Sequence, residues 1–295
     1  MSDAKEKIGF IGLGLMGQAL TRRLVERGYE VMGYDVVADK IRAAEAHGVR
    51  PSSSPAEVAQ ASAVVLVCVT STQDVRQVLF GADGIAEAAV RDRVVVDHST
   101  TEVEATRTMA ARLKSETGMS LVDAPVSGGP PAAAAGTLAI MAGGDAADIA
   151  RVASVMADLG TLTHMGPVGA GQTTKMVNQI LVLNNYCVLA EALALAEAGG
   201  VDASKIPDAL ASGHAGSNIL KALFPRMIRR DFAPTGYARQ VLKDLDMVQS
   251  LARDLKVPTP ISAQAASLFR IMVAKGHAEL DGIAVLKLYD GKEHV

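Results

Sequence analysis

The sequence predicts an α/β domain with a doubly wound sheet, followed by an all-α domain and joined to it by a long interdomain helix. In the first half, short β-branched runs alternate with amphipathic segments, which is typical of a parallel sheet covered by helices. After Gly166–Gly171 no convincing strand follows, and a long apolar helical segment begins. We therefore expect residues 1–167 and 168–295 to form the two domains.

The expected elements follow these patterns in chain order. Strands are expected at 8–11, 31–34, 63–69, 94–97, 121–123, 138–141 and near 161–164. Ser54 and Pro55 mark a helix start, and Thr101 with Glu104 forms a second candidate capping box. Another helix is expected from 72 or 73 to about 80. The second domain is expected to hold helices at 172–198, 206–212, 219–229, 240–255, 263–275 and 284–289.

Composition and charge are those of a globular protein. Hydrophobic residues make up 49% and charged residues 21% of the 295 residues. The formal net charge is −3, and no Lys/Arg run or basic-aromatic stripe occurs, so we expect no nucleic-acid binding. Cys68 and Cys187 lie in apolar runs, where cysteine is most often a small buried hydrophobe, which fits a reducing, cytoplasmic location.

One apolar segment, 176–199, has the length of a membrane span. It carries Glu191, Glu197 and several amides, which are costly inside a bilayer, so a buried helix of a soluble protein is the better interpretation. The charged lead 1–7 is followed by a strand and a glycine turn rather than a cleavage site. We therefore expect neither a signal peptide nor a membrane partner.

A glycine-rich turn, Gly12-Leu13-Gly14-Leu15-Met16-Gly17, follows the first strand directly. A helix over 16–27 and a second strand come next, in the order of a Rossmann-type dinucleotide site. There the first glycine allows a tight turn, the second lets a pyrophosphate approach the backbone, and the third lets helix and strand pack closely. The start of the helix supplies N–H donors and positive potential to the phosphates.

Asp35 ends the second expected strand, where an acidic side chain accepts hydrogen bonds from the adenosine ribose hydroxyls. A carboxylate there repels the extra phosphate of NADP, and Val36 and Val37 offer no arginine to bind it. The sequence therefore predicts NAD as the cofactor. The alternative is that Asp35 is an ordinary turn or cap residue.

Ser99 and Thr100 follow the fourth long strand, at the carboxyl edge where ligands bind in open α/β sheets. They could merely start the next helix. Because Thr101 is assigned that role through Glu104, Thr100 is predicted to face the nicotinamide ribose.

Three polar groups remain as candidates for the chemistry. Ser127, Gly128 and Gly129 can present a hydroxyl and consecutive N–H groups to a carboxylate, or form just a flexible turn. Lys175 and Asn178 are three residues apart and share one helix face, which suits a lysine general base with a polar partner, although a lysine near a helix start is usually a solvated charge. The segment 243–246 by itself indicates a surface charge cluster.

Together these motifs resemble the β-hydroxyacid dehydrogenase family, which includes 3-hydroxyisobutyrate dehydrogenase and tartronate semialdehyde reductase. The likeness rests on the segments 9–17, 123–129, 169–171 with Lys175 and Asn178, and Lys243-Asp244-Leu245. It covers essentially the whole chain. Four motifs in the family's order make a chance match very improbable.

The resemblance implies a role for each motif. Lys175 would be the catalytic acid/base, while Ser127, Gly128, Gly129 and Asn178 would bind the substrate. Lys243 would contact cofactor and substrate, and the family suggests a homodimer or homotetramer. Relatives commonly have Leu-Pro where this chain has Val69-Thr70, in a loop expected near the adenosine half of the cofactor. His214, Ser217 and Asn218 lie in a loop that varies with substrate, and they line the pocket or are ordinary loop and cap residues.

The sequence thus predicts NAD-dependent oxidation of a small 3-hydroxy acid such as 3-hydroxyisobutyrate, or the reverse reduction, with no metal. A tartronate semialdehyde reductase, or another aldehyde-acid reductase of the family, is the main alternative. Imine reductases typically lack the lysine found at 175, and a 6-phosphogluconate dehydrogenase needs a longer helical region. A non-catalytic dinucleotide sensor is the alternative of another class. Which hydroxy acid is the substrate does not follow from these residues.

Overall fold

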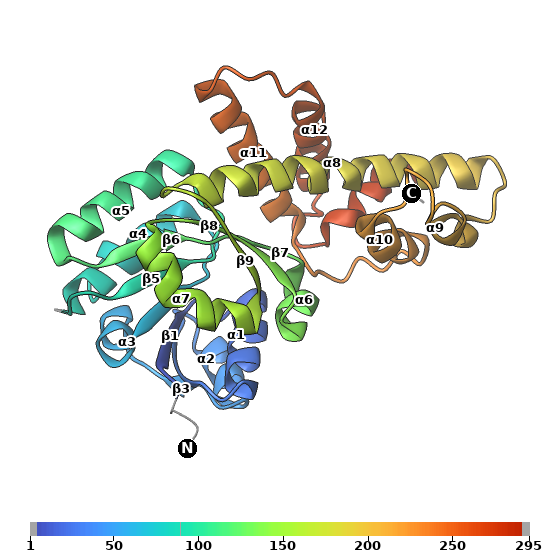
Figure 1. Ribbon diagram of the computed structural model, residues 1–295. Coiled ribbons are helices and arrows are strands. Elements are labelled where there is room, and N and C mark those ends of the chain that lie inside the picture. Colours follow the sequence, from blue (N-terminus) through green and yellow to red (C-terminus); the bar gives the residue numbers. More distant parts are fainter. Residues whose placement is uncertain (1–4, 89, 291–295) are drawn as a thin grey trace. The chain divides into compact units, whose positions relative to one another are not determined.

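The computed structural model describes residues 5–88 and 90–290 (Figure 1). The chain divides into two compact units, residues 1–175 and 176–295, and each is described by itself. The division falls inside helix α8 (Ala170–Ala198), between Lys175 and Met176. The domain boundary expected between residues 167 and 168 stays a prediction.

Unit 1 contains one mixed sheet in the order β3-β2-β1-β4-β5-β6-β8-β7, with β9 paired to β8. The six strands from β3 to β6 run parallel, which confirms the Rossmann-type, doubly wound fold class. β8 is antiparallel to both β6 and β7, because the short connection from β7 to β8 is too small for a parallel crossover. The strands are β1 (Lys7–Ile11), β2 (Glu30–Tyr34), β3 (Arg50–Pro51), β4 (Val64–Val67), β5 (Val94–Asp97), β6 (Ser120–Asp123), β7 (Val126–Ser127), β8 (Leu138–Gly143) and β9 (Gly160–Gly166).

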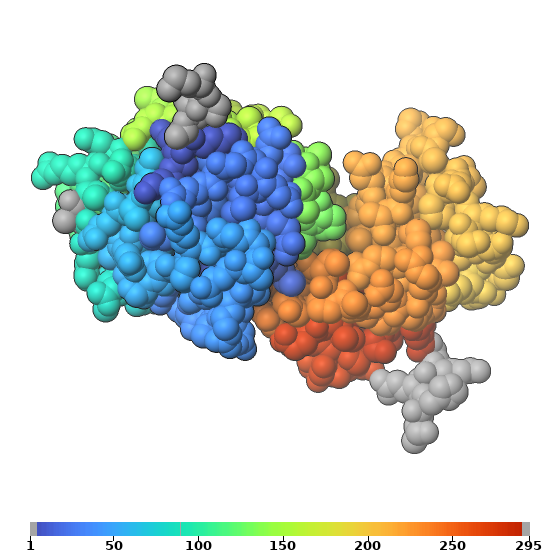
Figure 2. Space-filling model, turned by 90° about the horizontal axis from the view of Figure 1, so that it is seen from below, coloured from blue at the N-terminus to red at the C-terminus, as the bar shows by residue number. Residues whose placement is uncertain are grey.

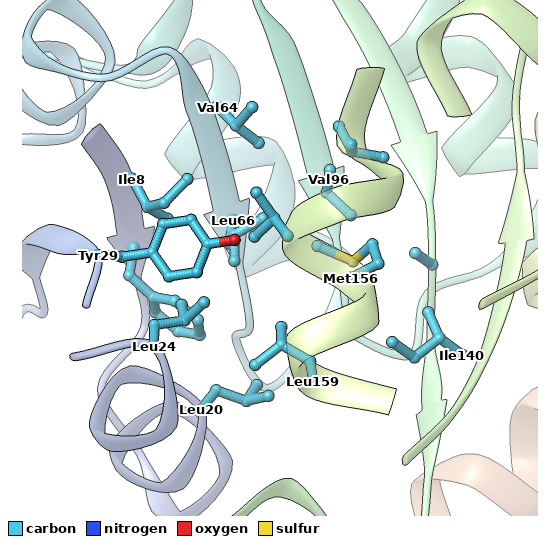
Figure 3. Packing of buried hydrophobic residues seen from close by; sticks show 14 of the residues in the cluster. Ile8, Leu20, Leu24, Tyr29, Val64, Leu66, Val96, Ile140, Met156 and Leu159 are labelled. Carbon is cyan, nitrogen blue, oxygen red and sulfur yellow. The ribbon is translucent and has the colours of Figure 1, made fainter. Parts of the chain in front are cut away.

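Helices cover both faces of this sheet because the strand side chains alternate in direction. Val64 and Leu66 of β4 pack in one apolar cluster with α1 and α7, while Val65 and Val67 pack in another with α3, α4 and α5. Figure 3 shows the first cluster, in which Met156 approaches Leu66. Each buried leucine contributes roughly 1.5–3 kcal/mol. The helices are α1 (Leu15–Glu26), α2 (Ala38–Glu45), α3 (Pro55–Ala61), α4 (Thr72–Phe80), α5 (Val103–Thr117), α6 (Gly129–Ala135) and α7 (Ala146–Leu159).

Helix caps confirm one of the two capping predictions. Ser54 accepts a hydrogen bond from the Glu57 amide at 3.2 Å and starts α3 with Pro55 at its first position. The prediction of a capping box at Thr101 was wrong, because α5 begins at Val103 and its N-cap residue is Glu102. The Thr101 side chain is buried and lies 2.8 Å from the Thr106 hydroxyl, so tertiary packing takes it away from the helix start.

Unit 2 is all helical apart from an isolated bridge, in the part of the chain that the structure describes. Its core joins Leu193 of α8 to Phe224, Leu245 and Phe269 of three later helices. By length and composition α8 is apolar enough to cross a membrane, a test that core helices of soluble proteins also pass. Its elements after α8 are α9 (Ile206–Ala209), α10 (Asn218–Ile228), α11 (Ala238–Asp254), α12 (Pro260–Ala274) and two 3-10 helices, at Ala203–Lys205 and Gly282–Leu288.

An ion cluster around Asp158 joins the end of α7 to the start of the chain. Lys5 Nζ, Arg27 Nε and Tyr29 Oη donate to its carboxylate at 2.7, 2.6 and 3.0 Å. Burial alone would raise the pKa of Asp158, but these hydrogen bonds lower it to about 2.

The segment from β2 to α3, coloured blue, forms much of the surface of unit 1 seen in Figure 2.

We expect Asp158→Asn to lower the free energy of unfolding by roughly 1–2 kcal/mol at pH 7, since it weakens charge-assisted bonds at a partly exposed position. A lowered pKa means that this stabilisation is present above the ordinary value of 3.8 and is lost as the pH falls towards 2. Urea unfolding of both proteins between pH 7 and pH 2.5 measures the difference. A difference that stays constant over this range would contradict the assignment.

Candidate functional site

At two positions of the turn between β1 and α1, neighbouring protein atoms leave room for glycine alone. The Gly12 amide donates to the carbonyl of Tyr34 at 2.9 Å, and its φ is +96°. A Cβ at Gly12 would lie 2.2 Å from the carbonyl oxygen of Cys68, and one at Gly17 would lie 2.0 Å from that of Gly12. Protein atoms therefore exclude any side chain at Gly12 and Gly17.

Gly14 is different, because no protein atom closes the space in which its side chain would lie. Its φ is −72°, and a Cβ built on it meets nothing within 4 Å. Gly14 is the N-cap of α1, whose first turn holds no acidic residue, so the helix start keeps its positive potential. An open space in front of N–H donors fits a pyrophosphate group. Leu13 is buried, Met16 is partly buried and Leu15 is exposed beside this space.

Asp35 lies directly after β2, against the same turn. Its carboxylate accepts the Leu13 amide at 2.8 Å and the Val37 amide at 2.9 Å, one on each oxygen. Lys40 Nζ lies 3.6 Å from Asp35 Oδ1. Each carboxylate oxygen can accept more than one hydrogen bond, so ribose hydroxyls can still be bound. Val36 and Val37 are exposed, and neither carries a positive charge.

The ends of β4 and β5 lie at the same edge of the parallel sheet. The Ser99 hydroxyl accepts the Val69 amide at 2.9 Å, and the Ser99 amide donates to Asp97 Oδ1 at 2.9 Å. Ser99 is therefore a buried structural residue, and Thr100 beside it is partly exposed. Thr70 is exposed in the loop after β4. Contacts of Val69, Thr70 and Thr100 with a cofactor stay predictions.

Lys175 is brought to the segment that follows β6. It is 8% exposed, and its amine donates to the carbonyl of Val126 at 2.8 Å. Ser127 belongs to the short strand β7, Gly128 is the N-cap of α6, and Gly129 is its first residue. This segment, for which a flexible turn was the alternative interpretation, is thus a strand end followed by a helix start, with positive φ at both glycines. Ser127 is the residue that follows Val126, whose carbonyl accepts the hydrogen bond from Lys175.

In unit 2, Asn178 and Lys243 are linked through the side chains of Gln179 and Asp244. Asn178 Nδ2 donates to Gln179 Oε1 at 2.9 Å, and Gln179 donates in turn to the Asp244 carboxylate. Lys243 Nζ lies 3.0 Å from the other oxygen of Asp244. Sequence reasoning assigned no role to Gln179, although a buried amide in an apolar helix was a signal for one.

The loop before α10 contains the three candidate pocket residues. Ser217 accepts the Leu220 amide at 3.1 Å and caps α10, so it has a structural role. His214 and Asn218 are exposed within this unit. A role in substrate binding stays a prediction for all three.

Two buried groups at the strand ends were not assigned roles from the sequence. Burial raises the pKa of Asp123 to about 6, even though amide hydrogen bonds from Gly169 and Gln172 lower it. Burial lowers the pKa of His98 to about 4, and its Nδ1 lies 2.7 Å from the carbonyl of Ala124. His98 is therefore neutral at pH 7. Among the described residues, no group of three His, Cys, Asp or Glu side chains could hold a metal ion.

Comparison with known proteins gives the family of the chain. Residues 7–169 match the family described as the NAD binding domain of 6-phosphogluconate dehydrogenase, and residues 169–289 match the NAD-binding family of NADP-dependent 3-hydroxyisobutyrate dehydrogenase. The chain belongs to the β-hydroxyacid dehydrogenase family. It is an oxidoreductase that uses a nicotinamide dinucleotide, and its family acts on hydroxy acids.

Three relatives of this dehydrogenase show the breadth of the likeness. A 3-hydroxyisobutyrate dehydrogenase-like mitochondrial protein of Arabidopsis thaliana is 36% identical, over 95% of this chain and 86% of its own length. The 2-hydroxy-3-oxopropionate reductase of Escherichia coli K12 is also 36% identical, over 95% and 96%. The structure of Mycobacterium tuberculosis 3-hydroxyisobutyrate dehydrogenase with L-serine is 30% identical, with a TM-score of 0.85 over 97% of this chain and 99% of that one.

Proposed function

We propose that the protein catalyses NAD-dependent oxidation of a small 3-hydroxy acid to its semialdehyde or keto acid, or the reverse reduction, with Lys175 as the acid/base. The observation that carries this proposal is the buried Lys175 amine, 2.8 Å from the carbonyl of Val126 and next to Ser127. A lysine bound to the segment that carries Ser127 and the amides of Gly128 and Gly129 suits a substrate that bears a carboxylate near a hydroxyl.

In this proposal, Ser127 and the amides of Gly128 and Gly129 bind the substrate carboxylate, and Asn178 binds its hydroxyl. A nicotinamide dinucleotide, which the glycine turn and Asp35 would hold, would supply the hydride acceptor for oxidation and the hydride donor for reduction. Lys175 Nζ takes the hydroxyl proton as the C–H electron pair leaves, so the carbon becomes a carbonyl. In the reverse direction the Lys175 ammonium gives the proton to the carbonyl oxygen. The protein fixes distance and proton position.

The substrate class is supported by the relatives. Those described above are named for 3-hydroxyisobutyrate and 2-hydroxy-3-oxopropionate, and one structure contains L-serine. All three molecules are small acids that carry an oxygen on the carbon β to the carboxylate. We propose 3-hydroxyisobutyrate-like acids as substrates, with reduction of 2-hydroxy-3-oxopropionate (tartronate semialdehyde) as the main alternative.

A spectrophotometric screen tests this function. The purified protein is given NAD and then NADP with 3-hydroxyisobutyrate, D-glycerate, L-threonate and L-serine, and NADH with 2-hydroxy-3-oxopropionate. We expect a change in NADH absorbance with at least one of these acids, in the presence of NAD. If no acid gives a change while NADH still binds, the protein is a dinucleotide sensor rather than an enzyme.

The preference for NAD is tested at Asp35. In Asp35→Asn the charge that repels a 2′-phosphate is lost, and Lys40, 3.6 Å from the carboxylate, becomes available to attract that phosphate. We expect the ratio of kcat/KM for NAD to that for NADP to fall by roughly 10- to 100-fold, the effect of one charge-assisted hydrogen bond. Steady-state kinetics with both cofactors measures the ratio.

The matched control removes a nearby charge that faces solvent. Asp39 is paired with Arg42 on α2 and its side chain is 79% exposed, so Asp39→Asn is expected to change the ratio by less than about 2-fold. Wild-type activity confined to NADP would contradict the role of Asp35.

We also propose that the protein is cytoplasmic and forms a homodimer or homotetramer. One face of α8 carries four large apolar side chains, each at least 52% exposed within the single chain: Val177, Leu181, Val188 and Leu195. Such a stripe favours contact with a second copy, because burial removes its apolar surface from water. A monomer mass in sedimentation velocity at micromolar concentration would contradict this assembly.

A further inference from the structure

The start of α8 is fastened by a buried carboxylate from the sheet. Asp123, the last residue of β6, is 0% exposed. Its Oδ1 accepts the Gly169 amide at 2.7 Å, and its Oδ2 accepts the Gln172 amide at 2.8 Å. Helix starts leave such amides without partners inside the helix, and here a side chain distant in the sequence supplies the acceptors.

Gln172 fastens the same turn to the segment after β5. Its side chain is 0% exposed, Nε2 donates to the carbonyl of Ser99 at 2.9 Å, and Oε1 accepts the Thr101 amide at 3.1 Å. Both ends of the side-chain amide are therefore satisfied by backbone groups. Because Gln172 and Lys175 are three residues apart, they lie on the same side of the helix.

The surroundings leave the Asp123 carboxylate little freedom to move. A Cβ at Gly143 would lie 2.5 Å from Asp123 Oδ1, and one at Gly171 would lie 2.8 Å from Oδ2. Any side chain at these two positions would displace the carboxylate. A buried carboxylate also carries a desolvation penalty, so Asp123 contributes a fixed geometry more than it contributes stability.

We propose that Asp123 and Gln172 are positioning residues of the reaction, which fix the first turn of α8 to the ends of β5 and β6 and thereby hold the Lys175 amine beside Val126. The inference rests on the proposed function, in which Lys175 moves the substrate proton. An error of about 1 Å in the placement of a reacting group lowers turnover by roughly 100-fold.

The test uses Asp123→Asn and Gln172→Ala in the full chain. In Asp123→Asn the new side-chain nitrogen would face an N–H donor, and Gln172→Ala would remove both side-chain bonds of the glutamine. We expect kcat to fall by roughly 10- to 100-fold in both variants. In Asp123→Asn the dissociation constant for NADH, measured by its fluorescence, is expected to change by less than about 2-fold. With substrate deuterated at the hydroxyl-bearing carbon, the isotope effect on kcat is expected to rise. Hydrogen exchange of peptides covering the start of α8 is expected to become faster.

Asp158→Asn is the matched control, since it weakens an ion cluster at the end of α7 and should lower stability without changing kcat. If Asp123→Asn and Gln172→Ala behave like this control, losing only stability, the inference is wrong. If Asp123→Asn does not fold, Gln172→Ala decides through kcat, the isotope effect and hydrogen exchange at the start of α8. Lys175→Ala is assayed in parallel, and normal turnover in that variant would overturn the proposed function instead.

Discussion

Lys175→Ala is expected to lower kcat by at least ~100-fold, the usual scale for a positioned proton-transfer group. The variant lacks the amine that lies beside Val126 and that, in the proposed function, takes the hydroxyl proton. Cofactor binding should persist, because the glycine turn and Asp35 are untouched. Initial rates with NAD and the best acid of the screen measure turnover, and NADH fluorescence measures binding.

The control for this variant is Lys114→Ala. Lys114 is an exposed lysine of α5 in the same unit, and its amine donates to the Ser120 hydroxyl at 3.2 Å. Its removal should leave kcat within about 2-fold of the wild type. Near-normal turnover in Lys175→Ala would remove Lys175 from the mechanism.

Gly14→Ala and Gly12→Ala should separate cofactor binding from folding. A methyl group at Gly14 meets no protein atom within 4 Å, so the unfolding midpoint should not change. It would enter the space assigned to the pyrophosphate, and we expect the dissociation constant for NAD to rise by roughly 10- to 100-fold, as overpacking of about 1–3 kcal/mol implies.

At Gly12 the same methyl group would lie 2.2 Å from the carbonyl oxygen of Cys68, on a residue whose φ is +96°. Strain and overpacking together should lower the free energy of unfolding by roughly 2–5 kcal/mol. Calorimetric binding and urea unfolding of both variants measure the two effects. Equal loss of stability in the two variants, or unchanged NAD binding in Gly14→Ala, would contradict the assigned pyrophosphate space.

The predicted capping boxes show where local reasoning holds and where it fails. Ser54 caps α3 because its hydroxyl, Pro55 and the Glu57 amide lie within one turn, and nothing distant competes. Thr101 fits the same local pattern. Its amide instead donates to Gln172, seventy-one positions along the chain, and its hydroxyl is hydrogen-bonded to that of Thr106. A pattern of four residues cannot report such a partner.

The candidate site likewise contains some features that the local sequence indicates and others that only folding creates. The glycine turn and the acidic residue after β2 were indicated by their spacing along the sequence. Lys175 was indicated by its spacing from Asn178 together with the family resemblance. The short strand β7 and the Gln179–Asp244 contact depend on segments brought together by folding. Two-residue strands carry no periodicity, and a single buried amide carries no motif.

The sequence by itself determined the fold class and the three-glycine turn, because periodicity, helix-stop signals and backbone freedom are local properties. Its four motifs carried the resemblance to the family. Only the tertiary structure decided why each glycine is there: Gly12 and Gly17 are closed by protein atoms, while Gly14 faces open space. It also decided that Asp123 holds the start of α8, since that carboxylate and the amides of Gly169 and Gln172 meet only when β6 and α8 pack. Contacts between distant segments follow from packing, which no local pattern encodes.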